Sequence, residues 1–377
     1  MSKVEELLAK YNSNGVSTIK LGDILDYEQP SKYIVSSSEY DDNYDIPVLT
    51  AGQSFILGYT DEKDGVYKAS KNNPTIIFDD FTTGHHWVDF DFKIKSSAMK
   101  MLRLKNDKSL LRYIFHSMAL INYVPTEHSR QWISKYSQFE IPLPHIKVQE
   151  EIVKILDSFT NLIDALNEEL SLRQKQFEYY REKLLTFETT DNNVIIDVLE
   201  NIAPYSKKRI KSEYLNAENY VGVDNLLQNK EGKYKSTSIP NTGSWTRYDE
   251  GDVLVGNIRP YLKKIWFADR IGGASGDVLV FSLKDKSLLH PKYLYYLLSS
   301  DKFFEYDNNS ARGAGMPRGD KKVICRYPIA FPKDKAIQQS IVSKLDAFES
   351  LISSLKEEIA LRQKQYEYYR EKLLTFE

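Results

Sequence analysis

Cysteine and long apolar runs are nearly absent from this chain of 377 residues. Cys325 is the only cysteine, so an intrachain disulfide and a cysteine-rich zinc site are excluded, and a reducing cytoplasmic compartment fits. A membrane-spanning helix needs a run of about 18 apolar residues, and no such run occurs. The first sixteen residues are charged and amphipathic and lack the apolar core of a signal peptide. We therefore expect neither a membrane span nor secretion.

Sequence motifs for catalysis are missing as well. No G-x-x-x-x-G-K-[ST] loop occurs, which argues against ATP hydrolysis. An adenine methyltransferase needs a glycine-rich loop for S-adenosylmethionine and an Asn/Asp-Pro-Pro-aromatic tetrapeptide; the nearest string, NNPT at 72–75, is typical of a turn. His85 and His86 are neighbours, and side chains of neighbours in a strand point to opposite faces, which argues against a shared metal ion. We expect no enzyme activity, no cofactor and no metal.

The dominant feature of the sequence is a stretch of seventeen residues that occurs twice. LRQKQFEYYREKLLTFE at 172–188 returns as LRQKQYEYYREKLLTFE at 361–377, with sixteen of seventeen positions identical and Phe177 replaced by Tyr366. Upstream of each copy, apolar residues alternate spacings of four and three, which indicates a helix with a narrow coiled-coil seam. The seam residues are Ile152, Leu156, Phe159, Ile163, Leu166 and Leu170, and then Ile341, Leu345, Phe348, Ile352, Leu355 and Ile359.

The repeat divides the chain into five segments. We predict a short N-terminal helix within 1–17 as the stub of a permuted repeat, a domain at 18–146, a long helix at 147–188, a second domain at 189–335, and a second long helix at 336–377. At about 1.5 Å per residue each long helix would extend about 60 Å. The predicted fold is therefore α/β (α+β): two similar domains separated by two long helices that form an antiparallel coiled coil with an internal pseudo-two-fold repeat.

Both domains have a mixed α/β pattern, but only the second is basic. Residues 189–335 hold 23 Lys and Arg against 18 Asp and Glu, whereas residues 1–146 hold 16 against 19. Short β-rich runs are separated by turn residues and accompanied by one helix in each domain. We predict strands at Tyr33–Val35, Ile46–Leu49, Thr75–Phe78, Met99–Leu104, Asp252–Val255, Lys264–Phe267 and Asp277–Ser282, and helices at Leu110–Asn122 and Pro291–Phe304.

The end of each domain carries a family resemblance. IPLP at 141–144 and IAFP at 329–332 precede Gln149 and Gln338, and each leads into a copied helix. This plan resembles the DNA-specificity subunit of type I restriction-modification systems over essentially the whole chain. GDVLVGNIRPYLKK at 251–264 and NNSARGAGMPR at 308–318 look like the strand and the glycine-rich recognition loop of that family, whereas IIFDDFTTGHHWVDF and VPTEHSRQWISK in the first domain depart from them.

The resemblance implies a function and a set of partners. Each domain would be a target-recognition domain that reads one half of a bipartite site in double-stranded DNA. The copied helices would be the conserved regions, which bind two modification (methyltransferase) subunits; restriction subunits join that core. S-adenosylmethionine and ATP would belong to those partners, and the length of the helices would set the gap between the half-sites.

Candidate DNA contacts are polar and aromatic residues in predicted loops. Glycine lets the backbone approach phosphates, and arginine can form two hydrogen bonds with guanine. In the second domain the candidates are Arg259, Tyr261, Lys263, Lys264, Arg312, Arg318, Lys321 and Lys322, with a solvated basic face as the alternative. In the first domain they are Ser129, Arg130, Gln131 and Trp132, of which glutamine suits adenine, together with His85, His86 and Trp87; for the two tryptophans a place in the core is the alternative.

The helices carry apolar residues outside their seam. Leu172 and Tyr179 occupy one off-seam heptad position, and Leu361 and Tyr368 repeat it. We predict a docking surface for the same subunit on each copy, with packing against the domains of the chain itself as the alternative. Arg173 and Arg362 fall within the seam, and we expect them to pair with acids near the first turns of the opposite helix.

These observations favour a non-catalytic reader of DNA sequence that also assembles a complex. A coiled-coil interaction scaffold with no role in nucleic-acid binding is the alternative. The half-site sequences do not follow from the chain, because base choice depends on loop conformation and on DNA shape.

Overall fold

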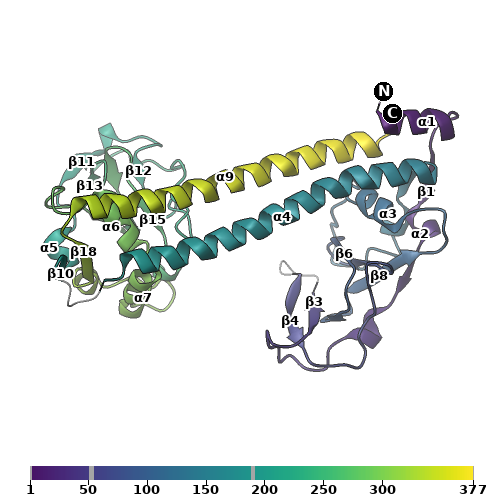
Figure 1. The fold of residues 1–377 in the computed structure, drawn as a ribbon, viewed down its shortest axis with the longest axis horizontal. Helices are drawn as coiled ribbons and strands as arrows, with labels where there is room; N and C mark the ends of the chain where they lie inside the picture. The colour runs from purple at the N-terminus through teal and green to yellow at the C-terminus, as the bar shows by residue number, and fades with distance from the viewer. Residues whose placement is uncertain (1, 51–54, 188–191, 377) are drawn as a thin grey trace. The chain divides into compact units, whose positions relative to one another are not determined.

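The computed structural model describes residues 2–50, 55–187 and 192–376, which divide into two compact units. Unit 1 comprises residues 1–167 and 357–377, and unit 2 comprises residues 168–356. The boundary crosses the two long helices, α4 (Ile146–Leu185) and α9 (Lys335–Leu374), so each unit holds one α/β domain and part of both helices (Figure 1).

Helices α4 and α9 are each 40 residues long and contain no glycine or proline. The predicted last residues of the two helices, 188 and 377, lie outside the described residues. In unit 1, Phe159 of α4 stacks on Tyr369 of α9 with ring centroids 5.4 Å apart; in unit 2, Tyr180 of α4 stacks on Phe348 of α9 at the same distance. The start of α4 thus meets the end of α9, and the end of α4 meets its start. The antiparallel pairing is confirmed.

The expectation for the seam arginines is wrong. Arg173 pairs with Glu169 at 3.3 Å, and Arg362 pairs with Glu358 at 3.1 Å, each on its own helix. A carboxylate four residues earlier is the nearest neighbour on a helix surface, so a flexible arginine reaches it first.

The domain of unit 1 is built from three sheets and three helices, α1 to α3, in the part that the structure describes. The sheets are ordered β2-β8-β5-β6, β4-β3-β7 and β1-β9. The elements are α1 (Lys3–Tyr11), β1 (Ser17–Lys20), α2 (Leu21–Ile24), β2 (Leu25–Glu28), β3 (Ile46–Leu49), β4 (Ile56–Thr60), β5 (Thr75–Asp79), β6 (His85–Val88), β7 (Lys93–Ile94), β8 (Met99–Leu104), α3 (Leu111–Met118) and β9 (Glu140–Leu143). Ile76 and Phe78 of β5 share a core with Tyr113 of α3 and Leu156 of α4, which fixes the domain on the helices.

One strand prediction in this domain is wrong. Residues Pro30–Tyr33 form a 3₁₀ turn, and the chain continues with a single bridge between Ile34 and Ile94. Proline at the first position fixes φ near the helical value and removes a backbone donor, which favours the turn over the strand. The predicted helix that begins near Leu110 ends at Met118, earlier than expected.

The domain of unit 2 repeats the plan with different detail. The sheets are ordered β15-β14-β17, β11-β13-β16-β12 and β10-β18. The elements are β10 (Val194–Val198), α5 (Leu199–Ile202), β11 (Arg209–Lys211), β12 (Tyr220–Val221), β13 (Ser244–Tyr248), β14 (Val253–Gly256), β15 (Ile265–Phe267), β16 (Gly272–Ala274), β17 (Val278–Phe281), α6 (Pro291–Leu298), α7 (Asp301–Ser310), α8 (Lys321–Ile324) and β18 (Pro328–Pro332). The single helix predicted at 291–304 is two helices, because the Ser300 side chain accepts the Phe303 N–H and starts α7 anew.

Each long helix begins with a buried glutamine that ties three elements together. Gln149 accepts hydrogen bonds from Ser109 Oγ (2.7 Å) and Leu110 N–H (3.0 Å) and donates to Pro144 C=O (2.8 Å). Gln338 accepts from His290 N–H (2.8 Å) and donates to two carbonyls, those of Leu288 and Pro332. Both glutamines are fully buried. Each glutamine is thus a clamp that joins the end of β9 or β18, the long helix and the segment before α3 or α6.

Candidate nucleic-acid interface and helix joints

Two loops of the second domain, residues 257–264 and 311–319, lie against each other where β14 ends and β17 begins. Ile258 forms a β-bridge with Arg318, and the Arg259 N–H donates to Pro317 C=O at 2.7 Å. Arg318 reaches Asp277, the residue before β17, at 3.0 Å. We call these two segments the basic loop pair. Six of the eight residues predicted for this domain lie in it, and Lys321 and Lys322 follow directly in α8.

The first of the two loops has an unfavourable backbone. Arg259 and Lys263 have φ values of 52° and 50°, the left-handed region, on either side of a 3₁₀ turn at Pro260–Leu262. Such non-glycine residues cost about 1–3 kcal/mol each, persist only where contacts hold them, and cluster at functional sites. Tyr261 on the turn is 53% exposed. The strained loop therefore projects an aromatic ring between two basic residues.

The basic residues of this region differ in how free they are. Lys263 pairs with Asp301 at 2.8 Å, and Lys264 Nζ donates to a carbonyl at 2.7 Å, so both hold the loop in place. Burial opposes ionisation of Asp301, but hydrogen bonds from Lys230 and Lys263 lower its pKa to about 2. Arg312 and Lys322 are exposed and have no acidic partner among the described residues. They are available to an anionic ligand.

The equivalent loops of the first domain are held by a buried carboxylate. Asp80 directly follows β5, and Asn257 directly follows β14. The backbone N–H of Asp80 donates to the Ala98 carbonyl, and the backbone N–H of Asn257 donates to the Asp277 carbonyl, both at 2.8 Å. Oδ1 of Asp80 accepts the N–H groups of Gln131 (3.1 Å) and Trp132 (2.8 Å). Oδ2 lies 3.2 Å from Lys100 Nζ and 3.5 Å from Arg130. Sequence reasoning missed Asp80 and Lys100; their only signals were an acid after one apolar strand and a lysine within another.

Two predicted contacts of the first domain lie inside it. Trp132 is 2% exposed and packs on Phe78 and Tyr136, so the core alternative holds for this ring. Gln131 is 1% exposed; its Oε1 accepts the Tyr123 hydroxyl at 2.7 Å, and its Nε2 donates to Ser129. In this structure the two side chains shape the loop and are not presented to DNA. Arg130 is exposed beside them, and Ser129 is half-buried.

The aromatic residues of β6 divide between the two faces of their strand. His85 and Trp87 face Phe115 of α3, with ring centroids 5.4 and 5.8 Å away. His86 stacks on Phe55 at 4.1 Å on the other face, as predicted for neighbours in a strand. Burial lowers the pKa of His85 to about 4, so this imidazole is neutral. Of the three, only His86 is exposed.

The joint between the first domain and the long helices is a hydrogen-bonded chain. His116 of α3 is fully buried and lies 2.9 Å from Asp157 of α4 and 3.0 Å from the Tyr366 hydroxyl of α9. Arg112 donates to the same carboxylate at 2.7 Å. Burial lowers the pKa of His116; the neutral ring can then donate from Nε2 to Asp157 and accept at Nδ1 from Tyr366.

The second joint uses different residues at the same positions. Lys292 occupies the position of Arg112 and pairs with Asp346 at 2.7 Å. Tyr296 occupies the position of His116, and its hydroxyl lies 2.5 Å from Asp346 and 2.9 Å from Glu349. The ring facing Tyr296 is that of Phe177, at 6.5 Å, because no hydrogen-bond partner is needed there. The one difference between the two copied stretches, Phe177 against Tyr366, is thus explained by the domain that each copy meets.

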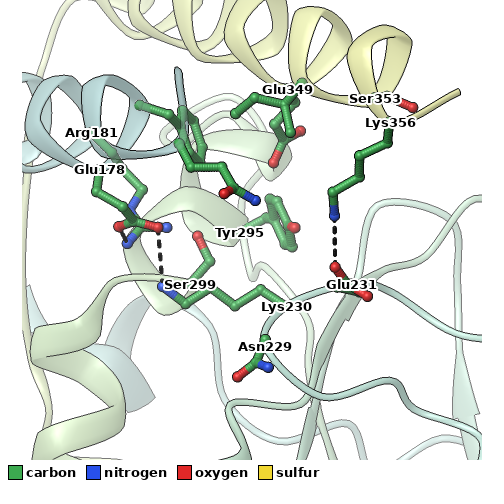
Figure 2. Close-up of a pocket in the computed structure, with 13 residues that line it drawn as sticks. Glu178, Arg181, Asn229, Lys230, Glu231, Tyr295, Ser299, Glu349, Ser353 and Lys356 are labelled. Carbon is green, nitrogen blue, oxygen red and sulfur yellow. Dashed lines mark hydrogen bonds and ion pairs between the residues drawn. The ribbon is translucent and has the colours of Figure 1, made fainter. Parts of the chain in front are cut away.

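Figure 2 shows a cavity of about 690 Å³ beside the second joint, between the two helices and the strap Asn229–Glu231. Lys230, which has a left-handed φ of 65°, reaches Glu178 (3.5 Å) and Asp301 (2.9 Å). Glu231 pairs with Lys356 of α9 at 2.6 Å. These ion pairs strap the second domain to both helices.

We expect Tyr366→Phe to weaken the first joint. The change removes the donor to a buried imidazole nitrogen, which costs about 1–2 kcal/mol. Urea unfolding of the full chain, followed by hydrogen exchange in α3, would measure the loss. The reverse change, Phe177→Tyr, is the matched control: Phe177 borders the cavity, so the added hydroxyl can be hydrated and the effect should stay within about 0.5 kcal/mol. Equal losses in both variants would contradict the matching of each copy to its domain.

The off-seam apolar residues of the helices are open to solvent. Leu172 and Tyr179 are 58% and 59% exposed, and Leu361 and Tyr368 are 65% and 59% exposed. The surroundings are also alike: Tyr179 and Tyr368 each lie 5.3 Å from the ring of the tyrosine that follows. All four side chains are therefore open to solvent, and the docking of another subunit on them stays a prediction.

Comparison with known proteins decides the family. The Type I restriction modification DNA specificity domain matches the chain twice, at residues 14–172 and 195–361. The chain belongs to the family of type I restriction-modification specificity subunits. The "Type I restriction enzyme EcoR124I/EcoR124II specificity subunit" of Escherichia coli is 37% identical to this subunit over 422 residues, which cover 100% of the chain and 97% of the relative.

More distant relatives agree with this assignment. A putative type I restriction enzyme specificity subunit of Haemophilus influenzae is 29% identical, over 86% of each chain. The crystal structure of a type I restriction-modification S subunit from M. genitalium matches with a TM-score of 0.61 over 96% of both chains at 13% identity, which shows a shared fold. As a specificity subunit, the chain is non-catalytic. Across the parts of the chain that the structure describes, no helix is long and apolar enough to cross a membrane.

Proposed function

We propose that this specificity subunit reads a bipartite site in double-stranded DNA, with one half-site bound by each domain. The observation that carries the proposal is the double match of the DNA specificity domain, once over each α/β domain and its helix. Two modification subunits would dock on the copied helices and supply methyl transfer, and restriction subunits would join that complex. The length of the helices would fix the number of unread base pairs.

The basic loop pair is the proposed contact surface of the second domain. Arg259, Tyr261 and Arg312 are exposed on it, and Lys322 follows on α8. Arginine suits guanine or phosphate, and an exposed ring can pack on bases or sugars. In the first domain the proposed contacts are His86, Ser129 and Arg130. Gln131 and Trp132 support the loop from inside, and His85 and Trp87 face α3.

The test is selection of sites from a randomised DNA library by the full chain with its modification subunits. Two separated blocks of preferred sequence are expected. A complex that binds without any sequence preference would overturn the proposal.

Removing Arg312 should weaken specific binding strongly. A good arginine contact to a base is worth about 1–3 kcal/mol, so Arg312→Ala should cost about 5- to 150-fold in affinity and relax the sequence of one half-site only. If Arg312 instead contacts phosphate, affinity falls equally on all sequences and the salt slope falls by about one. Lys284→Ala is the control, since this exposed lysine follows the far end of β17. Unchanged binding by Arg312→Ala would remove the loop from the interface.

A further inference from the structure

A buried acid lies under the basic loop pair with no cation paired to it. Asp307 of α7 is fully buried, and neither of its carboxyl oxygens has a hydrogen-bond donor among the described residues. Oδ1 of Asn257, which is 2% exposed at the end of β14, is likewise without a donor. A buried polar group that makes no bond costs about 1–3 kcal/mol, more if it is charged, so three such oxygens need an explanation.

These oxygens meet at the base of the loops. A β-carbon built on Gly319 would lie 1.8 Å from Asp307 Oδ1 and 3.0 Å from Asn257 Oδ1, so both atoms crowd against the same side of this glycine. The Gly319 N–H donates to Asn257 C=O at 3.3 Å, and the preceding residue, Arg318, bridges to Ile258 and Arg312. Asp307 and Asn257 therefore lie where the two loops are joined.

The first domain pairs its buried acid with a cation at this place. Asp80, the counterpart of Asn257, has the cation of Lys100 on the neighbouring strand. In the sheet of the first domain, Lys100 lies opposite Phe78, which is two residues before Asp80. In the second domain, Leu279 lies opposite Val255, which is two residues before Asn257. A buried leucine therefore takes the position of the lysine. The amide of Asn257 replaces the carboxylate, and the acid comes instead from α7. Among the described residues, no cation is paired with the acid of the second site.

We propose that Asp307 is a neutral carboxylic acid that positions the basic loop pair by donating its proton to Asn257 Oδ1, and that losing this proton weakens DNA binding by the second domain. The proposal rests on the DNA-reading role given above. In the protonated form one O–H···O bond ties α7 to the end of β14. Ionisation releases the proton to solvent and leaves a negative charge facing a second acceptor, which pushes the two elements apart.

The change falls near neutral pH. Burial raises the pKa of Asp307 to about 7. The titratable groups nearby are Tyr205, Cys325 and Asp320, none of which is a cation; burial, Cys325, Asp307 and Asp320 all raise the pKa of Tyr205. Arg318, the nearest loop cation in sequence, is paired with Asp277.

The decisive variant is Asp307→Asn, whose amide can donate to Asn257 Oδ1 and cannot ionise. Affinity for selected DNA is measured between about pH 6 and pH 8.5 with the full chain and its modification subunits. The natural chain should lose affinity above neutral pH, by at most about tenfold per pH unit for one proton. Asp307→Asn should bind as well as the natural chain at pH 6 and keep that affinity at pH 8.5. Asp307→Ala should be weak at every pH.

Controls separate this proposal from the one it rests on. Glu305→Gln changes an exposed acid of the same helix and should keep the pH dependence. If the natural complex selects no bipartite site at pH 6, the DNA-reading role fails. If it does select a site but its affinity is flat with pH, or if Asp307→Asn binds as weakly as Asp307→Ala, only the role of Asp307 fails. If Mg²⁺ raises the melting temperature of the natural chain but not that of Asp307→Asn, Asp307 binds a cation, and the proposal that it is a neutral acid is contradicted.

Discussion

Replacing Tyr179 by aspartate is expected to leave a complex with one modification subunit, where the proposed function gives the natural chain two. Tyr179 and Leu172 form an exposed apolar pair on α4, and Tyr368 and Leu361 form the same pair on α9. Exposed tyrosines that become buried at an interface are frequent hot spots, worth 2 kcal/mol or more. Adding the cost of burying an unpaired carboxylate gives at least about 3 kcal/mol, or roughly a hundredfold in affinity.

The two copies make the experiment self-controlled. Tyr179 belongs to unit 2 and Tyr368 to unit 1, so Tyr368→Asp should also remove one subunit, and the double variant should bind none. Native mass spectrometry of the complex measures the stoichiometry. Ser171→Asp adds the same charge about a quarter turn away on an exposed position of the same helix and should change nothing. Full complexes formed by the double variant would place the docking surface elsewhere.

Replacing Gln338 by leucine is expected to lower the free energy of unfolding of unit 2 by about 3–5 kcal/mol, because three polar groups, one buried and two partly buried, lose their partners at once. They are the N–H of His290 and the carbonyls of Leu288 and Pro332, each bonded to the Gln338 side chain at 2.7–3.0 Å. Leucine has a similar volume, so packing loss is a minor part of the cost.

A neighbouring glutamine provides the matched control. Gln339 is exposed, and Gln339→Leu should change stability by less than about 0.5 kcal/mol. Gln149→Leu should have the large effect in unit 1. Because the chain has two units, hydrogen exchange resolved by segment is the suitable measurement, and urea unfolding alone is not. A loss below 1 kcal/mol in Gln338→Leu would mean that water replaces the amide and that the clamp is dispensable.

What the sequence predicts well is periodic or local. The 4-3 spacing of Ile152, Leu156 and Phe159 needs no knowledge of the rest of the fold to indicate a seam, and the repeat then gives a second helix and an antiparallel pair. Six of the seven strand predictions, made from β-rich runs between turn residues, match strands of the structure. The prediction at Tyr33–Val35 failed because a proline just before it set a turn.

What the sequence does not predict is side-chain environment set by distant residues. Gln131 looks like a reader of adenine, yet Tyr123 and Ser129 engage its amide. Asp307 and Asn257 are 50 positions apart, and only the folded loops bring them to one glycine. Gln149 and Gln338 were noticed as part of a family pattern, but their clamping role depends on carbonyls whose orientation only the structure defines.

The near identity of the copied stretches has a consequence for symmetry. Unit 1 is completed by residues 357–377, and sixteen of the last seventeen of these also occur at 172–188. A half-length chain ending after α4 would therefore carry nearly all that is needed to complete unit 1 of a second identical half-length chain. The altered contacts would be Phe177 against His116 in place of Tyr366, with Leu170 and Ser171 in the places of Ile359 and Ala360. Two such halves would form a true two-fold dimer, and its DNA target would be palindromic, with the same half-site read in opposite directions.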